Sequence, residues 1–168
     1  MTTEKIILAG GCFWGMQSLI NEKDGVVETS VGYAGGDAKY TSYDFVKLGI
    51  TGHAESLEVI YDTEIITTRQ LIGLFLKIHD PTTFERQGND NGSQYRSAVF
   101  YTTDSQKHIV EKAIRDADKT GLWGNKIITE VKPFANFFTA EEEHQKYLEK
   151  TPNGYSCHYP RSDWNLPD

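Results

Sequence analysis

The chain has 168 residues, of which 38% are hydrophobic and 24% are charged, a composition typical of a globular protein with one well-developed core. Its 24 acidic residues outnumber 17 basic ones, and the net charge of -7 argues against nucleic acid or an anionic membrane as a partner. No apolar run approaches the length of a membrane span and no signal-peptide pattern is visible, so we expect a cytoplasmic protein.

The first predicted element is a buried strand, indicated by the short apolar run at 6–9. Two glycines then precede Cys12, and apolar residues recur at helical spacing from Phe13 onward. Cys12 is therefore expected on a turn between a strand and a helix, where the partial positive charge of the helix N-terminus stabilises a thiolate. The alternative is a small buried cysteine without chemistry. The coincidence of turn, dipole and flanking aromatic residues favours a reactive thiol.

Two further strands are expected in the first half of the chain. Residues 26–33 are rich in β-branched side chains, and residues 55–61 alternate between apolar and polar. Between them, residues 37–53 show no periodicity, and the same is true of residues 80–94 later in the chain. Long aperiodic loops in a compact domain are usually functional or mobile.

Three helices are predicted from one N-terminal signal, a threonine followed three residues later by Gln or Glu. These capping boxes begin at Thr67, Thr103 and Thr139. An apolar stripe follows each of the first two, and Gly121 is a stop signal for the second helix. The third helix, at about 140–150, is highly polar and is expected on the surface.

Strands at 96–102 and 127–131 and an irregular tail from about 152 complete the predicted order, β-α-β-β-α-β-α-β-α. Helices separated by single or paired strands predict an α+β fold, a two-layer sandwich with a mixed sheet of ferredoxin-like type. Because no internal repeat or linker is visible, we expect one domain over residues 1–168.

Cys12 and Cys157 are the two cysteines, and they lie at opposite ends of the chain. In a reducing compartment such a pair is more often catalytic than structural. There is no CxxC motif, and the five histidines are scattered without zinc-ligand spacing. We therefore expect neither a metal site nor another cofactor.

Four motifs are spread over nearly the whole chain: GCFWG at 11–15, GHAE at 52–55, GNDNGSQYRSAVFY at 88–101 and NGYSCH at 153–158. In order and spacing they resemble the peptide methionine sulfoxide reductase A family. The resemblance implies reduction of methionine S-sulfoxide, free or in oxidised proteins, with thioredoxin as the reductant. The oligomeric state is left open, with a monomer as the default.

The chemistry of such a reaction sets its own requirements. A sulfoxide sulfur is a poor electrophile until its oxygen is protonated, so the site needs a thiolate, an acid of raised pKa, further O–H donors and an apolar cradle for the S-methyl group. Cys12 would supply the thiolate. The resemblance implies Glu55 as the acid. Glu55 lies at the head of an apolar strand, where burial would raise the pKa of its carboxyl and keep it protonated. A solvated carboxylate at the end of a strand is the alternative for Glu55.

The resemblance also implies that two tyrosines donate hydrogen bonds to the sulfoxide oxygen. They match Tyr43, in the first aperiodic loop, and Tyr95, at the end of the second; Tyr40 is the alternative to Tyr43. Phe13 and Trp14 resemble the walls of the pocket for the S-methyl group. Packing in the core is the alternative for Phe13.

Two further positions carry implied roles. Asp90 matches a family position that orders the substrate pocket, and capping of a turn is an equally good alternative. Cys157 resembles the resolving cysteine, which condenses with the sulfenic acid left on Cys12. The family often has a third cysteine in a glycine-rich C-terminus, and this chain has none. We therefore expect thioredoxin to attack the Cys12–Cys157 disulfide directly.

Two other functions compete with this interpretation. A thiol peroxidase or redox sensor would use the same cysteine pair against peroxide, but it would not explain the Phe-Trp pair, the acid and the two phenols. A non-enzymatic thiol module that binds proteins through its loops would show no thioredoxin-dependent turnover of any sulfoxide.

Overall fold

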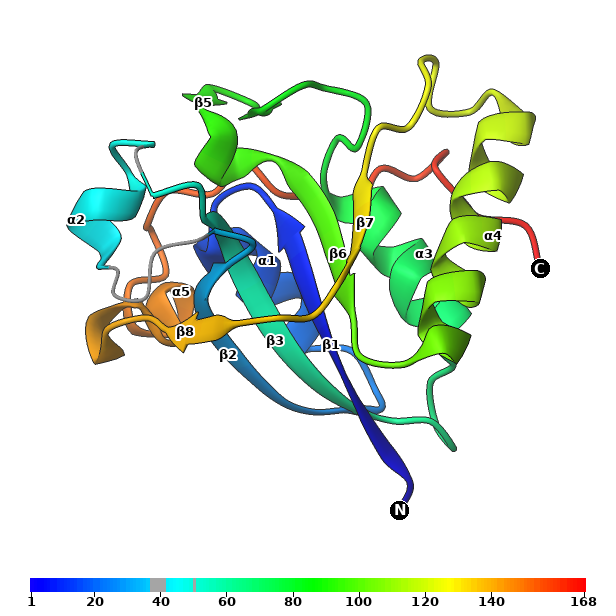
Figure 1. Ribbon diagram of the computed structural model, residues 1–168, viewed down its shortest axis with the longest axis horizontal. Coiled ribbons are helices and arrows are strands. Elements are labelled where there is room, and N and C mark those ends of the chain that lie inside the picture. Colours follow the sequence, from blue (N-terminus) through cyan, green and yellow to red (C-terminus); the bar gives the residue numbers. More distant parts are fainter. Residues whose placement is uncertain (37–41, 50) are drawn as a thin grey trace.

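The computed structural model describes residues 1–36, 42–49 and 51–168 (Figure 1). Over these residues the fold is built on a six-stranded sheet with the strand order β7-β6-β1-β3-β2-β8. Its strands are β1 (Thr3–Gly10), β2 (Val26–Ala34), β3 (Ala54–Asp62), β6 (Ser97–Tyr101), β7 (Glu130–Pro133) and β8 (Phe137–Thr139). Neighbouring strands are antiparallel except for the parallel pair β6–β7, so the sheet is mixed and the predicted α+β class is confirmed.

Helices cover one face of the sheet, and they provide most of the core. The three long ones are α1 (Phe13–Asn21), α3 (Thr68–Ile78) and α4 (Asp104–Thr120). On the opposite face a smaller apolar cluster lies under the chain between β7 and β8, which crosses in front of the sheet in Figure 1. The predicted strand at 6–9 is fully buried because Ile6 and Leu8 face the helices while Ile7 and Ala9 face the smaller cluster.

Two of the three predicted capping boxes begin helices. At α3 the Thr67 hydroxyl accepts from the backbone N–H of Gln70, and the Gln70 side chain accepts from the Thr67 N–H. At α4 the Thr103 hydroxyl accepts from the N–H of Gln106. The predicted stop at Gly121 is also confirmed, since this residue has a left-handed conformation with φ of 70°.

The third predicted helix is wrong. Thr139 is the last residue of β8, and the segment after it forms only a 3-10 turn, Glu142–His144, and one turn of helix, α5 (Tyr147–Lys150). His144 is buried rather than solvent-facing. The reason is physical: the segment has no apolar stripe to hold a long helix against the core, and its polar side chains bond to other elements instead.

The two aperiodic stretches contain short elements that periodicity did not indicate. The first contains α2 (Tyr43–Val46), while Tyr40 lies outside the described residues. The second contains a separate two-stranded sheet of β4 (Arg86–Gln87) and β5 (Asp90–Asn91), followed by the 3-10 turn Ser93–Tyr95.

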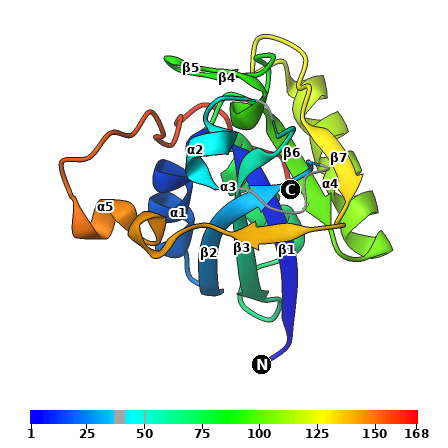
Figure 2. The ribbon, with the colours of Figure 1, turned by 60° about the vertical axis from the view of Figure 1, so that its left-hand side comes forward.

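The tail has no helix or strand after α5, as predicted from about 152. Figure 2 shows α5 beside α1, with the tail leading from it back toward β4 and β5. The tail thus brings residues from the C-terminal end of the chain next to the turn after β1. None of the described helices is both long and apolar enough to cross a membrane.

Candidate active site

Cys12 is the N-cap residue of α1 and is 6% exposed, on the strand-to-helix turn that the sequence predicted. Gly11 before it has φ of 95°, a conformation that side chains other than glycine rarely adopt. A Cβ at Gly11 would lie 2.6 Å from the side chain of Gln87 in β4. The turn therefore needs glycine both for its backbone conformation and for the close approach of β4.

The helix N-terminus acts on the Cys12 thiol in the expected direction, but burial outweighs its effect. Burial raises the pKa of the Cys12 thiol well above its usual range, and the nearby Glu55 raises it further. The backbone N–H of Trp14 lowers that pKa, but it does not offset the loss of solvation. Cys12 is therefore a protonated thiol at neutral pH.

Glu55 lies near the start of β3 and is 1% exposed, so the alternative of a solvated carboxylate is wrong. Its Oε1 accepts a hydrogen bond from the N–H of Phe13 at 3.3 Å, next to the Cys12 turn. Its Oε2 has no hydrogen-bond partner within the described parts of the chain. Burial raises the pKa of Glu55 to about 8, and its carboxyl is neutral at pH 7.

Tyr43 and Tyr95 lie half-buried around the same centre, in α2 and in the 3-10 turn before β6. Burial raises the pKa of Tyr43 to about 12, and the pKa of Tyr95 is raised for the same reason. In both tyrosines Glu55 and Cys12 add to the shift. The structure thus brings four predicted site residues close enough for the ionisation of each to affect the others, and both hydroxyls keep their protons at neutral pH.

Phe13 and Trp14 differ in their surroundings. Phe13 is fully buried, and its ring lies 5.8 Å from that of Tyr33 and 6.2 Å from that of Tyr43, so it belongs to the core as well as to the site. Trp14 is half-buried and stacks on Tyr147 of α5 with ring centroids 4.0 Å apart. An apolar wall next to the thiol is therefore formed mainly by Trp14 and the rings around it.

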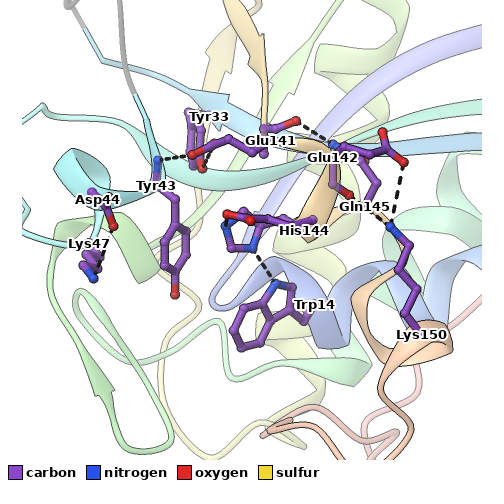
Figure 3. Close-up of polar contacts among 12 residues, drawn as sticks. Trp14, Tyr33, Tyr43, Asp44, Lys47, Glu141, Glu142, His144, Gln145 and Lys150 are labelled. Carbon is purple, nitrogen blue, oxygen red and sulfur yellow. Dashed lines mark hydrogen bonds and ion pairs between the residues drawn. The ribbon is translucent and has the colours of Figure 1, made fainter.

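Sequence reasoning missed His144, which holds this wall together (Figure 3). The indole N–H of Trp14 donates to Nδ1 of His144 at 3.1 Å, and the ring of Tyr43 lies 4.2 Å from the imidazole. Glu141, also missed, accepts from the hydroxyl of Tyr33 at 3.0 Å and from the N–H of Tyr43 at 3.2 Å. The one available signal was that the EEEH run lacks an apolar stripe and so does not suit a helix.

Glu141, Glu143 and His144 each place a potential metal ligand within 4.8 Å of the others. The donor set does not suit a metal ion. Because Nδ1 of His144 accepts from Trp14, the neutral imidazole carries its proton on Nε2 and has no lone pair there to offer. Both carboxylate oxygens of Glu141 are already hydrogen-bonded.

Asp90 does not cap a turn through its side chain in the contacts described. Its Oδ2 accepts from the hydroxyl of Tyr155 at 3.2 Å and so joins β5 to the tail. Cys157, two residues after Tyr155, is half-buried with its Sγ 3.9 Å from the carbonyl of Gln87. Both Cys157 and Asp90 contribute to the raised pKa of Cys12, and the two cysteines are free thiols.

Comparisons with known proteins show which family shares this sequence and fold. A sequence model of the family described as peptide methionine sulfoxide reductase matches residues 4–165. Peptide methionine sulfoxide reductase MsrA of Nocardia farcinica is 53% identical over 165 residues, which cover 98% of this chain and 95% of that relative. Reduced Mxr1 from Saccharomyces cerevisiae is similar with a TM-score of 0.89 and 42% identity, covering 95% of this chain and 93% of Mxr1. Mxr1 in complex with Trx2 is similar with a TM-score of 0.65 and 31% identity, covering 95% and 91%.

Proposed function

Because the chain belongs to the peptide methionine sulfoxide reductase family and reduces methionine sulfoxide, we propose that Cys12 is its nucleophile, Glu55 its acid and Cys157 its resolving cysteine. The observation that carries this proposal is the Glu55 carboxyl. It is buried, neutral at pH 7 and bonded by one oxygen to the N–H that follows Cys12, while its other oxygen has no partner in the described structure. A neutral carboxyl with a free O–H is what activation of a sulfoxide oxygen requires.

In the first step the sulfur of Cys12 attacks the sulfoxide sulfur while Glu55 donates its proton to the sulfoxide oxygen. The thiol proton of Cys12 passes to the Glu55 carboxylate, so Glu55 ends the step neutral. The oxygen ends on Cys12 as a sulfenic acid, and methionine is released as the sulfide. The raised pKa values of Cys12 and Glu55 support this exchange, because both groups start the step protonated.

Tyr43 and Tyr95 donate hydrogen bonds to the sulfoxide oxygen as negative charge develops on it. Their raised pKa values support this role, since each hydroxyl keeps its proton at neutral pH. Trp14 and Phe13 contact the S-methyl group, with Trp14 held by His144 and Tyr147. Asp90 acts on the site through its charge, which raises the pKa of Cys12 and Glu55, and it holds the tail through Tyr155.

In the second step Cys157 attacks the sulfenic acid on Cys12, a disulfide forms and water is released. A thioredoxin then reduces the Cys12–Cys157 disulfide. The structure of yeast Mxr1 in complex with Trx2 supports this assignment of the reductant. We assign the S epimer as substrate, free or within oxidised proteins.

The strand order supports a more specific description of the fold. The antiparallel order β6-β1-β3-β2, with α1 and α3 as the crossovers, is that of a ferredoxin-like unit. On this proposal β7, β8 and the tail are additions to that unit, within a single domain over residues 1–168.

Steady-state turnover of separated R and S epimers of N-acetylmethionine sulfoxide, with thioredoxin as reductant, tests the proposed function. We expect turnover of the S epimer alone. Equal turnover of both epimers would contradict the stereochemical assignment. Turnover of hydrogen peroxide without turnover of either sulfoxide would instead favour a thiol peroxidase.

A further inference from the structure

His158, the residue after Cys157, is the one buried histidine in the described structure that is bonded to the Cys12 turn. Its Nε2 lies 2.7 Å from the carbonyl oxygen of Gly10, two residues before Cys12. Its Nδ1 lies 3.9 Å from the Sγ of Cys157. One imidazole therefore contacts both the turn that holds the nucleophile and the cysteine proposed to resolve it.

The first of these contacts fixes the tautomer. A carbonyl oxygen only accepts, so the Nε2 of His158 must carry a hydrogen and donate it to Gly10. In the neutral imidazole Nδ1 is then left with a lone pair. That lone pair is one of two acceptors within reach of the S–H of Cys157, the other being the carbonyl oxygen of Gln87.

The imidazole is also held tightly in place. It is buried, and a Cβ at Gly15 of α1 would overlap Nδ1 of His158 and the hydroxyl of Ser156. On the other side of the tail, a Cβ at Gly88 would lie 3.1 Å from the Cβ of Cys157. Glycines on both sides thus allow the tail to approach closely, and they fix His158 against the start of α1.

Cys157 needs a proton acceptor if it is to attack. Burial raises the pKa of its thiol, so it is a thiol at neutral pH, and the thiolate is the nucleophilic form. Its other hydrogen-bond acceptor is the carbonyl of Gln87, which cannot take up a proton. The charged and titratable groups that act on the thiol are Tyr155, Asp90 and Arg161, and those that act on His158 are Arg161 and His79.

We propose that His158 is the base that takes the thiol proton of Cys157 as this cysteine attacks the sulfenic acid on Cys12. The inference rests on the proposed role of Cys157. A bond forms between the two sulfurs, the S–O bond on Cys12 breaks, and the sulfenic acid is reduced while the Cys157 thiol is oxidised. The proton moves from Cys157 to Nδ1 of His158 and then to the departing hydroxide, which leaves as water. Burial lowers the pKa of His158 to about 4, so the imidazole is neutral at pH 7 and its Nδ1 lone pair is available to accept a proton.

The test is a single turnover of N-acetylmethionine S-sulfoxide without thioredoxin, in wild type and in His158→Gln and His158→Leu. Glutamine keeps an N–H that can donate to Gly10 but has no basic nitrogen, whereas leucine removes both. His108→Gln, at an exposed position on α4, is the matched control. Methionine release reports the first step, and loss of two thiols with a Cys12–Cys157 peptide reports the second.

We expect His108→Gln to match wild type in both steps. His158→Gln, which keeps a donor for Gly10, should still release methionine, while its disulfide formation slows about 10²-fold, the lower end of the usual effect of a positioned base. The sulfenic acid should accumulate and be trapped by dimedone. Disulfide formation in His158→Gln at the wild-type rate would overturn the proposal. If only His158→Leu were slow, His158 would serve to hold the tail against Gly10 and not as a base. Failure of wild type to release methionine would instead contradict the proposed function.

The pH dependence separates a lost base from a displaced sulfur. Without a base, disulfide formation in His158→Gln should rise about tenfold per pH unit below the pKa of Cys157, as the thiolate fraction does, and approach the wild-type rate at high pH. A rate that stays low at every pH would show that His158→Gln displaces Cys157, which would overturn the proton-transfer role. Tyr155→Phe tests proton transfer toward Asp90. If Tyr155→Phe has the tenfold-per-unit profile and His158→Gln does not, the base is Asp90 and the proposal is wrong.

Discussion

Glu55→Gln is the substitution that most directly tests the chemistry of the site, because it replaces the acid with a neutral group of the same size. The pKa of Glu55 is raised from 4.5 to about 8 in the folded protein by burial. Between these two values the unfolded chain ionises Glu55 while the folded protein keeps it protonated. Stability from this group is therefore fully present below pH 4.5 and is lost as the pH rises through about 8.

The size of this loss follows from the shift. Over the 2.5 pH units from 4.5 to 7, at 1.36 kcal/mol per unit, the wild type loses about 3 kcal/mol of unfolding free energy through Glu55. Glutamine does not titrate, so Glu55→Gln should not show this loss. The difference in unfolding free energy between the two proteins should change by about 3 kcal/mol across that range, in favour of Glu55→Gln at pH 7.

Urea unfolding at a series of pH values, followed by the fluorescence of the three tryptophans, measures this difference. In the same variant the first step of a single turnover should slow by roughly 10²–10⁴-fold, because no acid protonates the sulfoxide oxygen. In wild type that step should slow above pH 8, as Glu55 ionises. Parallel stability curves for the two proteins would refute the reasoning, since they would show that Glu55 is ionised in the folded state.

Four other substitutions test separate parts of the site. Cys12→Ser should release no methionine in a single turnover, because a serine hydroxyl lacks the acidity and nucleophilicity of a thiol; any release would show that another group reacts. Cys157→Ser should release one equivalent of methionine and stop as a sulfenic acid, which dimedone detects. If Cys157→Ser instead turned over with thioredoxin at the wild-type rate, Cys157 would have no role in the cycle. His144→Phe should raise KM several-fold with a smaller effect on the first step, because Trp14 loses the partner of its indole N–H, and an unchanged KM would separate Trp14 from the substrate. Gly15→Ala should slow disulfide formation and leave methionine release intact, because its Cβ overlaps Ser156 and His158; thiol counting at equal times separates the two steps.

The parts of the fold that could be predicted from the sequence are those set by local patterns. The apolar run at 6–9, the glycine turn before Cys12 and the capping box at Thr67 each specify their structure within a few residues. The error at 140–150 came from the same kind of evidence, because the Thr139 box matched a motif without an apolar stripe behind it. A capping signal stabilises a helix that packs, and by itself it does not make one.

The candidate site shows the same division. The motifs placed Cys12, Glu55, Tyr43 and Tyr95 in one cluster, but the contacts of His144 and His158 depend on pairings across more than 100 residues, which no local spacing encodes. The protonation of Cys12 was mispredicted because the sequence shows the helix end but not the burial. Burial removes water from the Cys12 thiol and raises its pKa by more than the N-terminus of one short helix lowers it.

The two ends of the sheet have a consequence for an enzyme that acts on damaged proteins. Both outermost strands are short, four residues in β7 and three in β8, and β7 ends in Lys132 and Pro133. The long strands β1 and β3 have a strand on each side, and β2 is paired on its outer side with β8 at Gly32, Tyr33 and Ala34. Short edges that carry lysine and proline are poor templates for strand addition, which is how unfolded chains begin to co-aggregate. The two outermost strands therefore offer an oxidised, partly unfolded substrate chain little to pair with.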